Sequence, residues 1–176
     1  QNTLTTSELA RVIPDSADLS IGTVNSIGIS QLETNSILIS NDGGTGTLDN
    51  AIQNTGLGFE VFDDLTQGDY NTGVGYKSLT KLTTGSNNSS LGRAALEANT
   101  TGNNNTGIGF AALEANTTGA SNVAVGKSAL AVNTTASENT AVGTDAMTAT
   151  TTGASNVAVG TDTLKSNTTG SSNTAL

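Results

Sequence analysis

The stretch Asn105-Thr-Gly-Ile-Gly-Phe-Ala-Ala-Leu-Glu-Ala-Asn-Thr-Thr-Gly-Ala-Ser121 decides the fold, because it is one copy of a 17-residue repeat that continues along the chain. Each unit begins with Asn, has an aliphatic residue and then Gly three and four positions later, and has a second large apolar residue eight positions later. The asparagines are Asn54, Asn71, Asn88, Asn105, Asn122, Asn139, Asn156 and Asn173. No insertion or deletion interrupts the seven complete units, and a truncated eighth follows. A repeat of this kind indicates a solenoid.

Each part of the unit has a local structural meaning. The segment Asn139 to Gly143 has β-branched residues and is too short for a helix. The Gly after the aliphatic residue suits a tight bend or a close approach of two backbones. Asn116 to Gly119 is a turn, since Asn tolerates left-handed backbone angles and Gly adopts them freely. Ala111 to Ala115 contains good helix formers but is too short for a stable helix.

These features predict an all-β fold, a parallel β-roll or β-solenoid built of 17-residue coils. Its strands stack in register on those of the coils above and below. At a strand spacing of ~4.8 Å, seven coils make a rod about 34 Å long.

The composition also points away from a compact globule. Aromatic residues make up 3% of the 176 residues and charged residues 12%, and the chain has no Trp or Cys. A globule of this size packs large apolar side chains at its centre, and a disordered chain is rich in charge and Pro. Neither description fits, which leaves an elongated repeat fold with a thin core.

Two apolar columns run through the repeats, and we expect them to form the core. Burying two large side chains offsets only part of the entropy lost in ordering a coil. Sharing the core among several chains around one axis reduces this deficit, so we expect a homotrimer, intertwined or side by side. The predicted core residues are Val74, Leu79, Leu91, Leu96, Ile108, Leu113, Val125, Leu130, Val142, Met147, Val159 and Leu164.

The units Asn71 to Leu79 and Asn139 to Met147 resemble repeats in phage tail-fibre proteins. They are also similar to a shorter repeat, Asn-x-x-Ala-(Val/Ile)-Gly, in the heads of trimeric autotransporter adhesins of the YadA type. The resemblance covers residues 54 to 176 and implies a left-handed trimeric β-roll. It implies a structural part of a virion tail fibre, a stiff shaft or head for host-cell attachment.

The same resemblance leaves a second function open, a bacterial trimeric surface adhesin that binds host matrix or cells. The 17-residue unit is longer than the adhesin repeat, and no stalk heptads or anchor barrel are present, which favours the viral alternative. The implied location is a virion or, for the adhesin, the extracellular space or cell surface. The implied partners are further copies of the chain, other fibre or virion proteins, and a glycan or protein receptor on the host cell.

Residues 1 to 53 do not follow the repeat, and we expect a small N-terminal β connector module there. Thr6 to Ile13 could form a short helix that Pro14 ends. Ser20 to Ile29 and Ser36 to Ser40 are rich in β-branched residues. The turn signal Asn41-Asp-Gly-Gly44 could close a hairpin with the residues that follow it.

The side chains argue against catalysis. The chain has no His or Cys, and we expect no enzyme activity, no catalytic residue, no cofactor and no metal site. The acidic residues Glu60, Asp63, Asp64 and Asp69 could offer oxygen ligands to a cation, but their spacing fits no known loop, and solvated charge explains them better. The net charge of −9 would repel nucleic acid, and no stretch is apolar enough to enter a membrane.

Three other patterns are open to a functional and a structural explanation. Asn99, Asn116, Asn133 and Asn167 begin glycosylation sequons, which any Asn-Thr-Thr turn would also produce. Columns of Thr could bind ice, or could simply bond coil to coil. The position five residues after each Asn varies most, and Tyr76, Arg93 and Phe110 there form a candidate receptor-contact strip, the alternative being a spacer surface with scattered exposed rings or rings packed at a subunit boundary.

Overall fold

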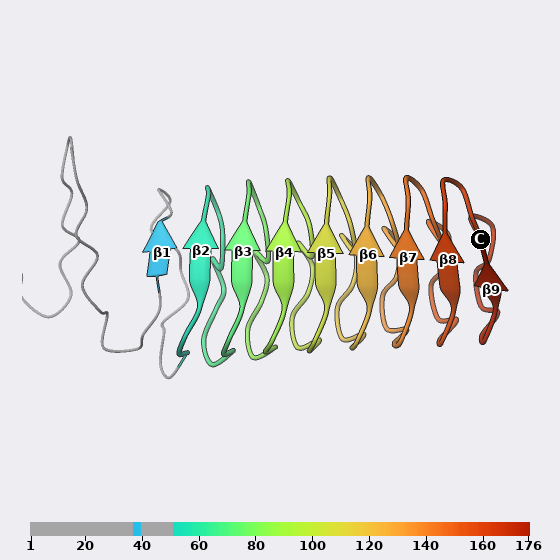
Figure 1. Cartoon of the computed structure of the whole chain (residues 1–176). Helices are drawn as coiled ribbons and strands as arrows, with labels where there is room; N and C mark the ends of the chain where they lie inside the picture. The colour runs from blue at the N-terminus through green and yellow to red at the C-terminus, as the bar shows by residue number, and fades with distance from the viewer. Residues whose placement is uncertain (1–36, 40–50) are drawn as a thin grey trace, which may run out of the picture. The chain divides into compact units, whose positions relative to one another are not determined.

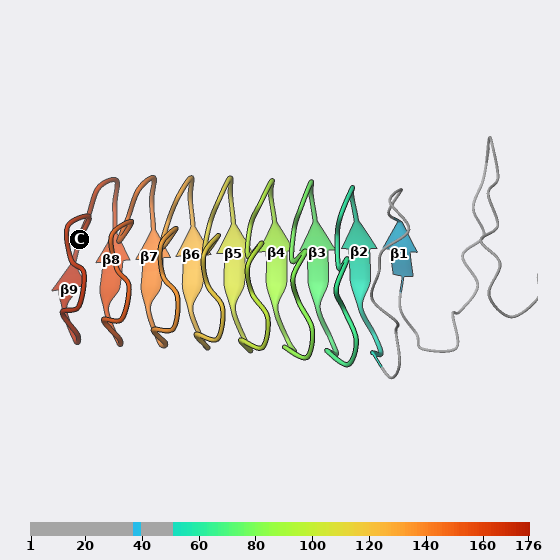
Figure 2. The same cartoon turned by 180° about the vertical axis from the view of Figure 1, so that it is seen from behind.

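The computed structural model describes residues 37–39 and 51–176, which form one row of stacked coils (Figure 1). A single sheet of nine short parallel strands runs along the row in chain order. The view from behind shows that the return segments form a second layer across the sheet (Figure 2). The strands are β1 (Ile37–Ile39), β2 (Thr55–Leu57), β3 (Thr72–Val74), β4 (Ser89–Leu91), β5 (Thr106–Ile108), β6 (Val123–Val125), β7 (Thr140–Val142), β8 (Val157–Val159) and β9 (Thr174–Ala175).

The register of the sheet follows the sequence repeat. From β2 onward each strand pairs with the residues exactly one repeat further along the chain, as in Thr106 with Val123. The backbone of the return segments also bonds from coil to coil, for example from Leu113 N–H to the Ala129 carbonyl at 3.0 Å. The prediction of an all-β parallel solenoid with one coil per repeat is therefore confirmed.

The sheet begins before the first repeat. β1 pairs in parallel with β2, and Ile37 lies opposite Thr55, so this step is slightly longer than the repeat. The strand expected in Ser36 to Ser40 is thus present, and it belongs to the solenoid sheet although we assigned it to a separate connector. The helix and the other strands and turns predicted in residues 1–53 lie outside the described residues.

Left-handed backbone angles bend each coil. In the coil of Asn105, Ala111, Leu113 and Ser121 have φ values of 55°, 54° and 58°. Such residues rule out a helix in the apolar segment, because a right-handed helix needs negative φ throughout. Asn116 and Gly119, where we expected left-handed angles, are not among the residues with positive φ. Asn116 instead makes a buried hydrogen bond, and Gly119 is needed because a side chain there would not fit.

A column of glycines lets neighbouring coils touch through their backbones. Gly109 has a φ of 127°, and a Cβ atom there would lie 2.6 Å from the carbonyl oxygen of Gly126 in the next coil. No other residue fits that space or that backbone angle. The equivalent residues, the glycine column, are Gly58, Gly75, Gly92, Gly109, Gly126, Gly143 and Gly160.

The core of each coil holds few large side chains. Leu79, Leu96, Leu113, Leu130 and Met147 are fully buried in one continuous cluster, and the partly buried Leu164 packs against it. In β2 to β8 the middle residue of each strand points at this column and is small. From β2 to β8 these residues are Gly56, Gly73, Ser90, Gly107, Ala124, Ala141 and Ala158.

The other half of the predicted core is wrong for the single chain. Leu91, Ile108 and Val159 are exposed, and Val74, Val125 and Val142 are half-buried. The physical reason is the period of two along a strand, which points alternate side chains to opposite faces. Because the small middle residue faces inward, the aliphatic residue after it must face outward.

Two columns of buried asparagine replace the missing apolar core. In the first asparagine ladder, Asn71 Nδ2 donates to Asn54 Oδ1 at 3.0 Å and to the Gly85 carbonyl at 2.9 Å. The backbone N–H of Asn88 then donates to Asn71 Oδ1 at 2.9 Å. Each buried amide thus links two coils and closes its own, which removes the cost of burying it.

The second asparagine ladder is shorter and is interrupted. Asn116 Nδ2 donates to Asn99 Oδ1 at 2.8 Å, and Asn133 Nδ2 donates to Asn116 Oδ1 at 2.9 Å. Thr150 takes the next position and donates to the Asn167 carbonyl instead. Consequently the buried Asn133 Oδ1 has no hydrogen-bond partner.

The glycine column gives the first test. We expect Gly109→Ala to lower the free energy of unfolding by about 3 kcal/mol or more, because Cβ meets backbone and φ is positive. The matched control is Gly107→Ala, since alanine already fills that position in Ala124 and Ala141. We expect the control to stay within about 1 kcal/mol of wild type in chemical denaturation. Equal loss in both variants would contradict the role of the glycine column.

The interrupted ladder gives a stabilising variant. Thr150→Asn supplies a donor to Asn133 Oδ1, and we expect a gain of about 1 kcal/mol and a higher Tm in thermal unfolding. Thr152→Asn makes the same exchange on an exposed residue and should change the Tm little. An unchanged or lower Tm for Thr150→Asn would show that Asn133 Oδ1 is satisfied in another way.

Candidate functional site

The outer surface of the sheet, here called the sheet face, carries two columns of outward residues. The first column comprises Thr55, Thr72, Ser89, Thr106, Val123, Thr140 and Val157. The second comprises Leu57, Val74, Leu91, Ile108, Val125, Val142 and Val159. None of these residues is charged, although the chain has a net charge of −9. Leu57 and Leu91 are 50% and 53% exposed, so the face is uncharged and has an open aliphatic column in the single chain.

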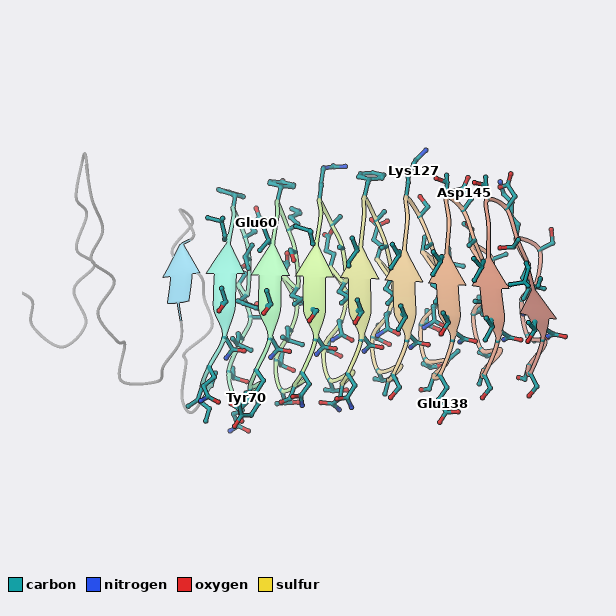
Figure 3. All side chains as sticks on the ribbon, in the orientation of Figure 1. Glu60, Tyr70, Lys127, Glu138 and Asp145 are labelled. Carbon is teal, nitrogen blue, oxygen red and sulfur yellow. The ribbon has the colours of Figure 1, made fainter. Side chains whose placement is uncertain are left out.

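A second surface lies just beyond the C-terminal ends of the strands. It consists of the residues five positions after each Asn, here called the edge rank. Lys127, labelled in Figure 3, projects from this edge of the sheet. The edge rank comprises Phe59, Tyr76, Arg93, Phe110, Lys127, Thr144 and Thr161.

The first four residues of the edge rank stack on one another from coil to coil. The rings of Phe59 and Tyr76 are parallel within 10°, with centroids 5.7 Å apart. The Arg93 guanidinium carbon lies 5.8 Å from the Tyr76 centroid and 5.1 Å from the Phe110 centroid. These distances suit ring stacking and cation–π attraction. The predicted contact strip of Tyr76, Arg93 and Phe110 is therefore brought together in one line.

The basic residues divide into paired and unpaired ones. Lys77 lies 3.2 Å from Glu60, whose hydrogen bond and charge raise the pKa of Lys77 above its ordinary value. Lys165 lies 2.6 Å from Asp162, and this hydrogen bond likewise raises its pKa. Within residues 51–176, Arg93 and Lys127 form no salt bridge.

The acidic residues of the first coil do not converge on one point. Glu60 pairs with Lys77, and Asp69 accepts a hydrogen bond from the backbone of Ile52 at 2.9 Å. Asp63 and Asp64 also make interactions. Among the described residues no group of three or more His, Cys, Asp or Glu side chains could hold a metal ion.

The sequon asparagines are structural where they lie inside the stack. The side chains of Asn99, Asn116 and Asn133 are fully buried in the second asparagine ladder. Only Asn167, in the last complete coil, is partly exposed. The paired Thr residues that follow also bond from coil to coil, as Thr100 Oγ1 does to the Thr117 carbonyl at 3.1 Å.

The sheet face is the surface that sequence reasoning missed. The sequence signal for it was the small middle residue of the repeat strands, because a Gly, Ala or Ser between two larger residues fits the narrow inner side of the coil. We predicted that the aliphatic residues face inward because they are the largest in the segment. The alternation rule, applied to Thr106-Gly-Ile108, places both flanking residues on the outer face.

In the part of the chain that the structure describes, no helix has the length and apolar character of a membrane span. Comparison of the chain with protein-family models, with curated proteins and with solved structures finds no match.

Proposed function

We propose that the chain is a structural component of a phage tail fibre or a similar appendage, in which three copies form a stiff shaft or head for attachment to a host cell. The observation that carries the proposal is the uncharged sheet face with its open aliphatic column along β2 to β8. An exposed face of this kind on an otherwise acidic chain indicates a contact surface for another protein. A second and a third copy of the chain offer a surface of the same length and chemistry. The number three follows from the resemblance to fibre and adhesin repeats.

The thin core supports association by the same face. Each coil from Asn88 to Asn139 buries one large apolar side chain and turns its aliphatic strand residue outward. Joining the sheet faces of three chains would bury the outer column as well and would add the hydrophobic stabilisation that the single chain lacks. The core then extends across chains, as expected from the sequence.

Stiffness follows from the bonding between coils. Backbone bonds, both asparagine ladders and the Thr hydroxyls all run along the axis, so bending the rod would strain several bonds at each coil. A shaft of this kind can hold an attachment site at a fixed distance and, as a trimer, present it three times. A bacterial trimeric adhesin head would use the same properties.

The oligomeric state tests the proposal. We expect light scattering to give three times the chain mass of 17.5 kDa. The double variant Leu91→Lys with Ile108→Lys places charges on the sheet face and should give a folded monomer, since charge cannot be buried there without a partner. A wild-type chain that is monomeric and folded would refute the trimer.

The control for that experiment is Val132→Lys. Val132 is 41% exposed and lies outside the sheet strands, so it has the same chemistry as the sheet-face residues but another location. We expect this variant to remain trimeric. Dissociation of Val132→Lys would show that added charge disrupts the assembly regardless of position.

One observation favours a second function, ice binding, because the sheet face presents Thr and aliphatic residues at regular intervals. Thermal hysteresis of the wild-type chain separates the two functions. A buried sheet face in a trimer predicts no hysteresis, whereas an ice-binding monomer predicts hysteresis that Thr106→Lys abolishes.

A further inference from the structure

The edge rank uses aromatic residues in a way that the fold does not require. The chain has three Phe and two Tyr in all. Three of these five rings, Phe59, Tyr76 and Phe110, lie in the edge rank and are 37%, 43% and 44% exposed. A protein with a thin core gains most from burying its rings, so their exposed alignment points to contact with something outside the coil.

The stacking decides what the rings can offer to a ligand. Phe59 and Arg93 lie against Tyr76 from the coils on either side, and Arg93 also lies against Phe110. Ring faces that neighbours cover are closed to the stacking of a neutral sugar. What remains outside is the rims of the rings, which carry partial positive charge, together with two cationic side chains. The edge rank is therefore electropositive on a chain of net charge −9.

No carboxylate of the described residues forms a salt bridge with Arg93 or Lys127. The residue after each of them is Ala94 or Ser128, and Asp145, whose N–H donates to the Lys127 carbonyl at 2.9 Å, has its carboxylate paired with Lys165. The adjacent sheet face has no charged residue either. Several carboxylates of the neighbouring coils are paired with lysines outside the edge rank, Glu60 and Glu97 with Lys77, and Asp145 and Asp162 with Lys165.

The spacing of the two cations in the edge rank indicates which class of anion fits them. Arg93 and Lys127 are two coils apart, which corresponds to about 10 Å at the strand spacing of a parallel sheet. A nucleic acid carries a phosphate every ~3.4 Å along each strand, so most of its charge would face uncharged or acidic residues. A linear polyuronate carries one carboxylate per sugar, a lower charge density than that of a nucleic acid, so that every second carboxylate along the chain can reach one of the two cations.

From this geometry we propose that the edge rank binds an acidic polysaccharide, laid along the solenoid axis with its carboxylates at Arg93 and Lys127 and its sugar rings over the rims of Tyr76 and Phe110. The proposal deepens the attachment part of the proposed function, since it names the chemistry of the surface that is attached. It does not need the trimer, although three chains would present three such ranks.

The experiment is a calorimetric titration with polygalacturonate at low salt. The variant Arg93→Thr with Lys127→Thr removes both cations, and Thr already stands at this position in Thr144 and Thr161, so the fold is retained. We expect binding about tenfold weaker or more in this variant, and a shallower dependence of affinity on salt.

The matched control is Lys81→Asp, which makes the same change of two in net charge outside the edge rank and leaves the Lys165 ion pairs intact. Asp already stands at this repeat position in Asp64. We expect binding within twofold of wild type. Equal weakening in the control would overturn the proposal, because it would show a response to net charge alone.

Two further ligands complete the test. Dextran, a neutral polysaccharide, and single-stranded poly(dT) should bind far more weakly than polygalacturonate. No binding of polygalacturonate by the wild type, equal binding of dextran, or tighter binding of poly(dT) would each overturn the proposal. Light scattering on the same samples distinguishes the two proposals. A trimer that does not bind polygalacturonate would refute only the proposed ligand, and a monomer that binds it would refute only the proposed trimer.

Discussion

The close approach of successive coils at the glycine column is the constraint on which the other features of the solenoid depend. At Gly109 the backbone of one coil meets the carbonyl of Gly126 in the next, so no side chain can separate them. This contact holds neighbouring coils at the spacing of β-strands, in the return segments as well as in the sheet. Every coil must then have the same length, because one extra residue would move each later side chain out of its column.

Equal coils at a fixed spacing make ladders of identical side chains possible. In the first asparagine ladder, the Asn of one coil lies within hydrogen-bonding distance of the Asn of the next, as Asn71 does of Asn54. An amide suits this role, since it has both a donor and an acceptor and can bond in both directions along the stack. The columns of Leu and Asn together fill the interior. Hydrogen bonds between the Asn side chains therefore supply part of the stabilisation that a wider solenoid gains from apolar packing.

The period of the sequence was enough to predict the class of fold, the strands and the stacking direction, because each depends only on which residues recur and how far apart. It also brought Tyr76, Arg93 and Phe110 together correctly, since residues one period apart must lie in one column. The orientation of the strands was harder to predict. Leu91 and Ile108 have the character of core residues, and only the small residue before each of them, Ser90 or Gly107, indicates that the inner face lies at the middle position.

The asparagines were misinterpreted for a related reason. Asn116 in Asn-Thr-Thr-Gly has the composition of a turn, and turn preference is a property of the single residue. Its burial is a property of the stack, because the amide is satisfied only by the equivalent amide of another coil. Thr150 shows the dependence directly, since exchanging one member leaves the acceptor of Asn133 without a donor.

The same geometry separates the residues that maintain the fold from those that can serve a function. Inward positions are tied to their equivalents above and below, so Gly109 or Asn116 cannot change without cost to the neighbouring coils. Outward positions touch only one another, and the edge rank passes from Phe to Arg to Lys to Thr without any change in the backbone. Any surface made in this way is a column with a fixed step along the axis. A partner that recognises several coils at once must therefore itself repeat, either as another copy of the rod or as a linear polymer with a period close to a multiple of the coil spacing.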